Sequence, residues 1–211
     1  MSYRTRFLEL ALECDALRFG QFTLKSGRVS PYFFDAGRFR SGAVLARLAG
    51  CYADAVEAAG IRFDMLFGPA YKGIALATAL ALEFARRGRD LPLAFDRKEA
   101  KDHGEGGRLI GAPPAGRVLV VDDVVTAGTA VRAALALLRG AGAQPCALVI
   151  GLDRRERGDG PHSAVRDLNE REGIEVIAVA DLDDLLQFAA ERPALAVHRE
   201  ALMAYRVRHG V

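Results

Sequence analysis

Cysteine is scarce in this chain, and the three residues present, Cys14, Cys51 and Cys146, lie far apart in apolar stretches. No CxxC pair and no Cys/His spacing could form a zinc site or a disulfide framework. Free thiols that pack as small apolar side chains are typical of a reducing compartment. We therefore expect buried, unpaired cysteines and a cytoplasmic protein.

Net charge and long apolar runs are also missing. Lys and Arg number 29 against 27 Asp and Glu, which leaves a formal charge of +2. This charge is too small for the broad positive field that non-specific nucleic-acid binding requires. No apolar run is long enough to cross a bilayer, and Glu9, Glu13 and Asp15 interrupt the stretch where a signal peptide would have its apolar core. We expect neither a nucleic acid nor a membrane as a partner.

The length and composition predict one folded unit. The chain has 211 residues, 51% of them hydrophobic and 27% charged, so it can bury a large core. One domain over residues 1–211 is the expectation for this length. Within it, residues 1–40 are interpreted as an N-terminal cap and residues 41–211 as the core.

Local patterns predict the elements of the cap and the first core helix. Helical spacing of apolar residues continues to about Leu17. The β-forming residues on either side of Ser26-Gly27 predict a hairpin over residues 19–37. Residues 41–59 predict a helix with Ser41 as N-cap and Gly60 just past its end.

Short apolar runs alternate with longer Ala/Leu-rich runs from Met65 onward. The expected strands are MLFG, LAFD, VLVV, ALVIGLD and IEVIAVA, and the expected helices run from Ile74 to about Arg87 and from about Gly128 to Arg139. This alternation predicts an α/β fold with a parallel sheet and helices on both faces. Ligands bind beyond the carboxyl ends of such strands. The segment EAKDHGEGG, residues 99–107, has no apolar periodicity and is predicted to be a mobile loop.

Two carboxylates and a small-residue turn follow a buried strand in VLVVDDVVTAGTA, residues 118–130. Such a turn presents backbone N–H groups at a helix N-terminus, where a phosphate binds. Asp122 and Asp123 would repel this phosphate unless they face sugar hydroxyls, a magnesium-bound ligand or a developing positive charge. The pattern predicts a site for a phosphate joined to a ribose, rather than two carboxylates that only cap the helix.

The same segment resembles the phosphoribosyl-diphosphate signature of the type I phosphoribosyltransferases. Walker A and GxGxxG loops are both absent, which disfavours mononucleotide hydrolases and dinucleotide enzymes. The resemblance implies a parallel-sheet core flanked by helices, with a small helix and hairpin as N-terminal cap. It also implies that Asp122 and Asp123 lie near the ribose hydroxyls. The donor-binding residues after them would be Val124, Val125, Thr126, Ala127, Gly128, Thr129 and Ala130, with the 5-phosphate held from Thr126 onward.

Four further segments resemble, in order, motifs of the orotate phosphoribosyltransferases within that family: LKSGRVSPYFFDAG, GPAYKG, FDRKEAKDHGEGG and GLDRRERG. The resemblance implies transfer of a phosphoribosyl group from 5-phosphoribosyl diphosphate to orotate, with Mg²⁺ as cofactor, in pyrimidine synthesis. It also implies a homodimer in which the loop 99–107 reaches the neighbouring subunit's site. Around the donor it places Lys25, Tyr71, Lys72, Arg97, Lys98, Lys101 and His103, and around orotate Phe33, Phe34, Thr126 and Arg154. The implied catalytic residues are Asp122, Asp123, Lys101 and His103.

The chemistry of the donor supports these assignments. A 5-phosphate and a diphosphate need several cations and a magnesium ion to be bound and to leave. The basic run RKEAK is also typical of a solvated charged surface, but its position after a predicted strand favours the ligand. We expect magnesium to be held mainly through the diphosphate and the ribose, without a protein metal site. His103 is interpreted as a donor to the leaving diphosphate and not as a metal ligand.

The chemistry of the acceptor points to two further side chains. Orotate is a flat anion, so its site needs an aromatic or apolar platform and a guanidinium that grips a carboxylate through two parallel hydrogen bonds. Phe34 and Arg154 fit these needs. Of Phe33 and Phe34, one is expected to be mainly structural.

Two alternative functions share parts of this pattern. A phosphoribosyltransferase for a purine or another pyrimidine would share the DDVVTAGTA segment, but LKSGRVSPYFF and Arg154 argue against it. A ligand-sensing regulator that binds nucleic acid would need a basic helix or an added module, and the sequence shows neither.

Overall fold

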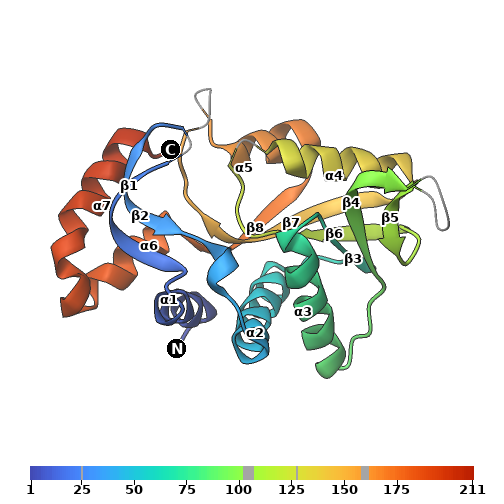
Figure 1. Ribbon diagram of the computed structural model, residues 1–211, viewed down its shortest axis with the longest axis horizontal. Helices are drawn as coiled ribbons and strands as arrows, with labels where there is room; N and C mark the ends of the chain where they lie inside the picture. The colour runs from blue at the N-terminus through green and yellow to red at the C-terminus, as the bar shows by residue number, and fades with distance from the viewer. Residues whose placement is uncertain (25, 102–106, 127, 158–161) are drawn as a thin grey trace.

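The computed structural model describes residues 1–24, 26–101, 107–126, 128–157 and 162–211 (Figure 1). The helices are α1 (Tyr3–Glu13), α2 (Gly42–Ala59), α3 (Lys72–Arg86), α4 (Thr129–Gly140), α5 (Ala164–Asp167), α6 (Leu182–Ala190) and α7 (Ala196–His209). The strands are β1 (Leu17–Thr23), β2 (Val29–Phe34), β3 (Met65–Gly68), β4 (Leu93–Lys101), β5 (Gly107–Gly111), β6 (Arg117–Val121), β7 (Gln144–Asp153) and β8 (Glu175–Asp181). Short turns of other helix types are η1 (Ala36–Arg38), η2 (Leu168–Glu172) and η3 (Pro193–Leu195).

The main sheet has the strand order β5-β4-β3-β6-β7-β8, and every neighbouring pair is parallel except β4 and β5. The chain leaves β3 toward β4 on one side and leaves β6 toward β7 on the other. The strand order therefore reverses between β3 and β6, and a crevice at such a switch point is where open α/β sheets bind ligands. The predicted parallel sheet is confirmed, with an antiparallel edge strand β5 that the sequence reading did not predict.

Side chains of the central strands alternate between two apolar cores, as the two-residue period of a strand requires. Leu119 and Val121 of β6 join the core beneath α1, α2 and α3, whereas Val118 and Val120 join the core under α4. Figure 1 shows these helices on opposite faces of the sheet. Both faces are covered, which explains why β6 is apolar at four successive positions.

Helix ends follow the predicted caps closely in the core. α2 begins after Ser41, whose side chain accepts a hydrogen bond from the backbone of Val44, and ends at Gly60 with φ 67°. α3 begins at Lys72, two residues before the predicted start, and α4 runs to Gly140. The first helix is shorter than predicted, since α1 ends at Glu13 and Asp15 adopts a positive φ of 55° that turns the chain into β1.

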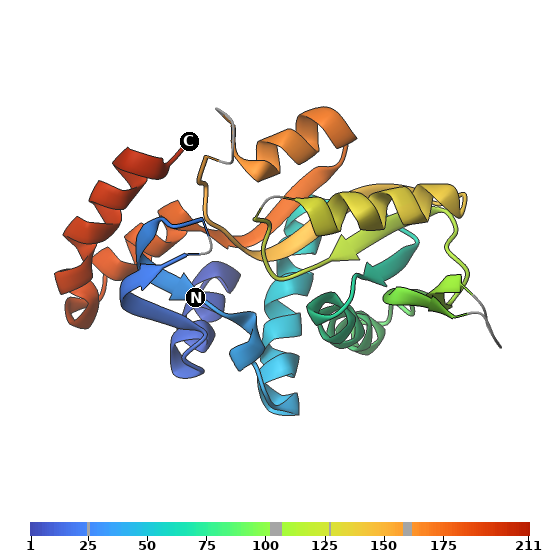
Figure 2. The same cartoon turned by 45° about the horizontal axis from the view of Figure 1, so that its top comes forward.

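The predicted hairpin forms a separate two-stranded antiparallel sheet of β1 and β2. Figure 2 shows it at one end of the main sheet, next to α7 and far from β4 and β5. The Phe19 ring stacks on His198 of α7, with 5.1 Å between the ring centroids. Helices α6 and α7, which the sequence reading left unassigned, therefore complete this end of the molecule.

The predicted loop 99–107 is corrected at both of its ends. β4 continues to Lys101 and β5 begins at Gly107, and these two residues are paired in an antiparallel ladder. Residues 102–106 lie outside the described residues. Backbone pairing across the two strands organised the flanks of the segment, although its sequence has no apolar periodicity.

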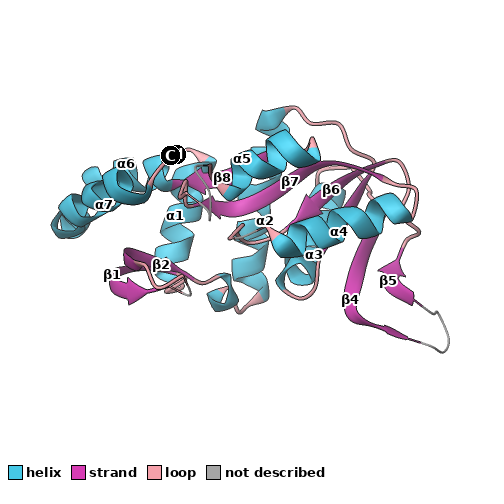
Figure 3. Ribbon diagram, turned by 90° about the horizontal axis from the view of Figure 1, so that it is seen from above, coloured by secondary structure: helices cyan, strands magenta, loops and turns pink. Residues whose placement is uncertain are grey.

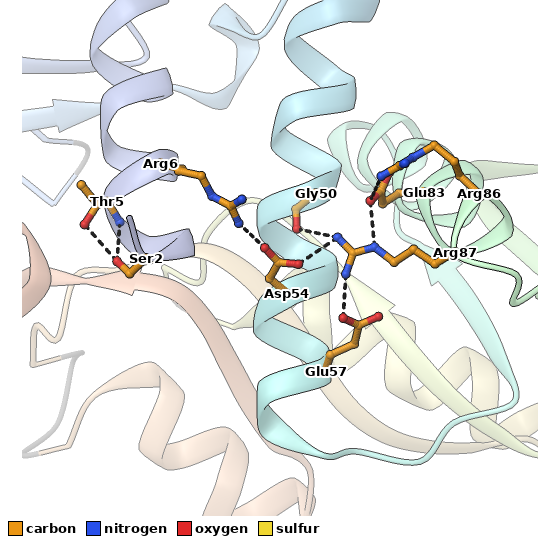
Figure 4. Close-up of polar contacts among 9 residues, drawn as sticks. All are labelled: Ser2, Thr5, Arg6, Gly50, Asp54, Glu57, Glu83, Arg86 and Arg87. Carbon is orange, nitrogen blue, oxygen red and sulfur yellow. Dashed lines mark hydrogen bonds and ion pairs between the residues drawn. The ribbon is translucent and has the colours of Figure 1, made fainter.

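A charged network joins the three helices beneath the sheet (Figure 4). Asp54 of α2 accepts hydrogen bonds from Arg6 of α1 and, at 2.8 Å, from Arg87 at the end of α3. Arg87 also pairs with Glu83 at 2.8 Å and with Glu57 at 2.6 Å. Hydrogen bonds from Arg86 and Arg87 lower the pKa of the Glu83 carboxyl to about 2, against the opposing effect of burial. The network thus links α1, α2 and the end of α3 through charged side chains.

The structure also tests the expectations about thiols and membranes. All three cysteines are unpaired; Cys51 is buried, whereas Cys14 and Cys146 are only half-buried. Within the part of the chain that the structure describes, no helix combines the length and apolarity needed to span a bilayer.

A close contact between β3 and α3 gives a stability prediction. A Cβ on Gly68 would stand 2.4 Å from the carbonyl oxygen of Gly73 and 2.9 Å from the Ala77 side chain. Backbone cannot yield cheaply, so Gly68→Ala should lower the free energy of unfolding by about 1–3 kcal/mol in urea denaturation. The control is Gly50→Ala in α2, where a Cβ meets nothing within 4 Å. Because alanine favours a helix over glycine, this substitution should raise the free energy of unfolding by up to about 1 kcal/mol. Equal effects of the two substitutions would contradict the close contact.

Candidate active site

The sequence motifs meet at the carboxyl edge of the sheet. Tyr71 and Lys72 follow β3, Asp122 and Asp123 follow β6, and Arg154 follows β7. Lys98 lies in the outer half of β4, beyond the residues that pair with β3. Because these strands are parallel neighbours, residues up to 83 positions apart in the sequence converge on one crevice.

The turn between β3 and α3 is held by backbone contacts. Gly73 packs so closely that a Cβ would stand 2.7 Å from the carbonyl oxygen of Val121 and 2.6 Å from Pro69. The backbone N–H of Ala70 donates to Oδ1 of Asp96 at 2.6 Å, and the Ala70–Tyr71 peptide is cis. Asp96 is buried, so its carboxylate is a fixed anchor for this turn. The sequence pattern gives Asp96 only a position at the end of the strand LAFD and no role at the site.

Tyr71 and Lys98 are brought together from two neighbouring strands. The Lys98 ammonium lies 4.6 Å from the centroid of the Tyr71 ring, and this ring is 68% exposed. Arg97 is on the opposite face of β4, as strand alternation requires. Its Nε is buried and has no hydrogen-bond partner among the described residues. The structure thus groups Lys98 with Tyr71 but separates Arg97 from them.

Asp123 is the centre of the polar contacts in the crevice. Lys72 Nζ donates to Asp123 Oδ2 at 2.6 Å, which joins the turn after β3 to the end of β6. Asp123 is 7% exposed, so this ion pair is partly removed from water. Burial by itself would lower the pKa of Lys72, but its hydrogen bond and ion pair with Asp123 outweigh this effect, and the pKa is raised.

A second layer holds the Asp122–Asp123 backbone. The buried Tyr52 hydroxyl of α2 donates to the carbonyl oxygen of Asp122 at 3.1 Å, and the Gly151 N–H donates to that of Asp123 at 2.9 Å. Only glycine fits at position 151, since a Cβ there would stand 2.7 Å from the Tyr52 hydroxyl. The sequence assigns no role at the site to Tyr52 or Gly151, because both are far from Asp122 and Asp123 along the chain.

Asp122 is in an unusual electrostatic position. Burial, followed by the negative charge of Asp123, raises the pKa of the Asp122 carboxyl to about 7. Its Oδ1 accepts a hydrogen bond from the Asp123 N–H at 2.9 Å, which favours the charged form but does not outweigh these effects. The two neighbouring carboxyls therefore differ in role: Asp123 is paired with a cation, and Asp122 is poised to change charge near neutral pH.

The turn after the acidic pair encloses a cavity of about 250 Å³, lined by Asp122, Val124, Val125, Thr126, Gly128, Thr129, Ala130 and Val131. Gly128 has φ 72° and precedes the first residue of α4, so backbone N–H groups of the helix start border the cavity. This arrangement suits an oxyanion such as a phosphate. The described part of the predicted phosphate turn thus lies where the sequence pattern indicated.

The two phenylalanines of the hairpin have different surroundings. Phe34 shares a face of β2 with Ser30 and Tyr32, and its ring packs 5.9 Å from that of Phe7 in the core. Phe33 is on the other face, 5.6 Å from the Phe22 ring, with the Arg18 guanidinium 5.4 Å away. Ser30 and Tyr32 contact Arg154. The structure therefore places Phe34, and not Phe33, on the side of β2 that faces Arg154.

Arg154 is surrounded by polar partners. Its Nε donates to Glu156 Oε1 at 2.7 Å, and its Nη2 lies 2.6 Å from the same oxygen. Nη2 also donates to the Ser30 hydroxyl at 3.0 Å and to the Tyr205 hydroxyl at 3.4 Å. One edge of the guanidinium is thus already occupied. Glu156 is within the motif GLDRRERG, but the sequence predicts no role for it. Tyr205 is in a segment for which the sequence predicts neither a motif nor a role.

Some predicted residues lie outside what the structure describes. These are Lys25, His103 and Ala127, together with the side chain of Lys101. Among the described residues, no three His, Cys, Asp or Glu side chains form a group that could hold a metal ion.

Comparison with known proteins shows the family of the chain. A model of the phosphoribosyl transferase domain matches residues 39–183. An orotate phosphoribosyltransferase of Xanthomonas euvesicatoria is 65% identical over 211 aligned residues, which cover 99% of this chain and 96% of the relative. The chain belongs to the orotate phosphoribosyltransferase family. An orotate phosphoribosyltransferase of Stenotrophomonas maltophilia is 62% identical, with 99% of this chain and 97% of the relative covered.

Solved structures support the same family and the type I phosphoribosyltransferase fold. A crystal structure of the orotate phosphoribosyltransferase of Francisella tularensis aligns with a TM-score of 0.87 and 38% identity, covering 97% of this chain and 99% of the other. The UMP synthase of Leishmania donovani aligns with a TM-score of 0.77 and 28% identity, but only 42% of that longer chain is covered. The family places the chain among enzymes of pyrimidine synthesis, as the sequence motifs predicted.

The raised pKa of Asp122 predicts a pH-dependent stability. In the unfolded chain the carboxyl is ionised above about pH 4, from its usual value of 3.8, whereas in the folded protein it holds its proton up to about pH 7. The free energy of unfolding of the wild type therefore falls as the pH rises toward 7. The Asp122→Asn variant lacks this decrease, because asparagine does not ionise. The melting temperature of Asp122→Asn should rise relative to wild type between pH 5 and pH 8.

The control for this measurement is Asp90→Asn, which removes the same charge from an exposed position. Its melting temperature relative to wild type should change little over the same interval, because water and salt screen an exposed charge. A difference for Asp122→Asn that is as flat as the control would show that Asp122 is ionised in the folded protein throughout this range.

Proposed function

We propose that this member of the orotate phosphoribosyltransferase family binds 5-phosphoribosyl diphosphate in the crevice between β3 and β6 and transfers its phosphoribosyl group to a ring nitrogen of orotate. The observation that carries this assignment is the adjacency of the Lys72–Asp123 pair and the cavity of about 250 Å³ after β6. A cation, two carboxylates and a helix N-terminus within one crevice match a diphosphate, a ribose and a 5-phosphate in turn.

Catalysis by these residues is electrostatic. When the bond between the anomeric carbon and the diphosphate oxygen breaks, positive charge develops on the ribose and negative charge on the leaving group. Carboxylates at the end of β6 stabilise the first, and Lys72 and Lys98 from the neighbouring strands stabilise the second. The ion pair holds both kinds of charge in place before the substrate arrives, so little reorganisation is needed in the transition state.

Magnesium is the cofactor that we propose. When bound, it would neutralise charge on the diphosphate and orient this leaving group. The donor set at the end of β6 fits this ion, since two carboxylates are hard oxygen ligands and Mg²⁺ usually completes its shell with waters and substrate phosphates. Because Asp123 is engaged by Lys72, Asp122 is the carboxyl with more capacity for the ribose and its metal.

We further propose that the protein acts as one domain in a homodimer, with the segment 99–107 reaching the neighbouring subunit. Figure 3 shows the outer parts of β4 and β5 projecting away from the body of the sheet. A strand pair that extends beyond its own crevice is suited to contribute side chains to a second subunit. The three unpaired thiols agree with the cytoplasm as the proposed location.

Asparagine at position 123 tests the proposed chemistry. Asp123→Asn should lower turnover by at least about 100-fold, the scale for removing one preorganised charge from a transition state, with a small change in melting temperature. Loss of orotate absorbance after addition of the donor and magnesium measures turnover, and exposed Asp90→Asn is the control with wild-type activity. Intact turnover together with a large loss of stability would show that Asp123 is a structural cap.

Mixing two inactive variants tests the shared site. Lys101→Ala removes the proposed crossing cation, and Asp123→Ala damages the crevice. If the segment acts across the interface, a mixed dimer has one site with both defects and one intact site. An equal mixture should recover about a quarter of wild-type activity, because half of the dimers are mixed and each has one intact site. Absence of recovery despite proven subunit exchange would place Lys101 in its own subunit's site.

A further inference from the structure

The guanidinium of Arg154 is held from three separate segments. Ser30 comes from β2, Glu156 from the loop after β7, and Tyr205 from α7. The Tyr205 hydroxyl also donates to Glu156 Oε1 at 2.8 Å, so the partners are bonded to one another as well as to Arg154. The face of the guanidinium is covered by the Tyr32 ring, whose centroid is 4.3 Å from Cζ.

All of these partners are buried or nearly so. Ser30 is 0% exposed and Tyr205 is 5% exposed, and the side chains of Arg154 and Glu156 are 14% and 12% exposed. Hydrogen bonds between charged groups in such surroundings are strong and geometrically specific. Arg154 therefore cannot turn freely toward a ligand, because turning would break both of its short contacts with the nearly buried Glu156 carboxylate. Glu156 would then keep only the Tyr205 hydroxyl at 2.8 Å and the more distant Arg28 at 3.6 Å.

The hydrogen-bonding capacity that remains on Arg154 is small. Nε has one hydrogen, which Glu156 takes, and the two hydrogens of Nη2 face Glu156, Ser30 and Tyr205. Nη1 is the guanidinium nitrogen without a partner among the described residues. Two parallel hydrogen bonds would use either the Nε–Nη2 edge, which Glu156 occupies, or the Nη1–Nη2 edge, where Nη2 already donates to Ser30 and Tyr205.

We propose that Glu156 and Tyr205 are positioning residues that restrict Arg154 to a single-point contact with the acceptor through Nη1. The proposal rests on the assignment of Arg154 to the orotate site under the proposed function. Glu156 balances only part of the positive charge around it, since its other carboxylate oxygen lies 3.6 Å from Nη1 of Arg28. The acceptor carboxylate thus meets a cluster of two guanidiniums and one carboxylate. Recognition then depends on where Nη1 is held, and α7 contributes to this position through one hydroxyl group.

Two conservative variants test the proposal. Tyr205→Phe removes the hydroxyl but keeps the ring, and Glu156→Gln removes the charge but keeps the shape. Each hydrogen bond that orders Arg154 should change the orotate KM by about 2- to 12-fold, so we expect a several-fold rise for Tyr205→Phe and a larger one for Glu156→Gln. The donor KM and the melting temperature should change little. Tyr3→Phe, which removes a hydroxyl from α1, is the matched control.

A binding measurement separates positioning from general loss of structure. Orotidine 5′-phosphate and uridine 5′-phosphate differ only in the carboxylate, so the ratio of their dissociation constants reports how well the carboxylate is read. This ratio should move toward one in both variants and stay unchanged in Tyr3→Phe. Unchanged ratios and unchanged orotate KM in an active enzyme would overturn the proposal, as would equal rises in both KM values. A wild-type protein that forms no product from orotate would instead refute the proposed function.

Discussion

The ion pair between Lys72 and Asp123 is the constraint on which the rest of the crevice depends. It spans the two strands between which the sheet reverses its order, and it requires that the turns after β3 and β6 approach closely. Glycine at positions 68, 73 and 151 makes this approach possible, since a side chain at any of them would meet neighbouring atoms at less than 3.0 Å. The backbone contacts beneath the pair thus determine where its charges lie.

Much of this architecture could be predicted from the sequence, because it is local. The two-residue and 3.6-residue apolar periods identified the central strands, and Ser41 and Gly60 marked the ends of α2. The acidic pair and its small-residue turn were recognisable since a strand end, a turn and a helix start occupy one continuous segment. The antiparallel pairing of β4 and β5 could not be recognised from the sequence, because no apolar period continues through the paired residues.

The contacts around the acceptor side were beyond the reach of sequence reasoning for a different reason. Ser30, Arg154 and Tyr205 are separated by more than 50 positions, and their hydrogen bonds exist only after the hairpin and α7 have packed at one end of the sheet. A motif can nominate Arg154, but it cannot show that Glu156 two residues later occupies one edge of the guanidinium. Likewise, only the pairing of β1 with β2 shows that Phe33 and Phe34 face opposite sides.

These observations separate the site into two halves with different physical origins. Backbone and glycine contacts within the sheet position the donor half, so few substitutions there preserve the geometry. The acceptor half is positioned by side-chain hydrogen bonds between the hairpin, the loop after β7 and α7. A change of a single hydroxyl or carboxylate can therefore alter how the base is read while the donor site keeps its shape. Under the proposed function, selectivity for the base and the chemistry on the ribose are therefore controlled by different parts of the fold.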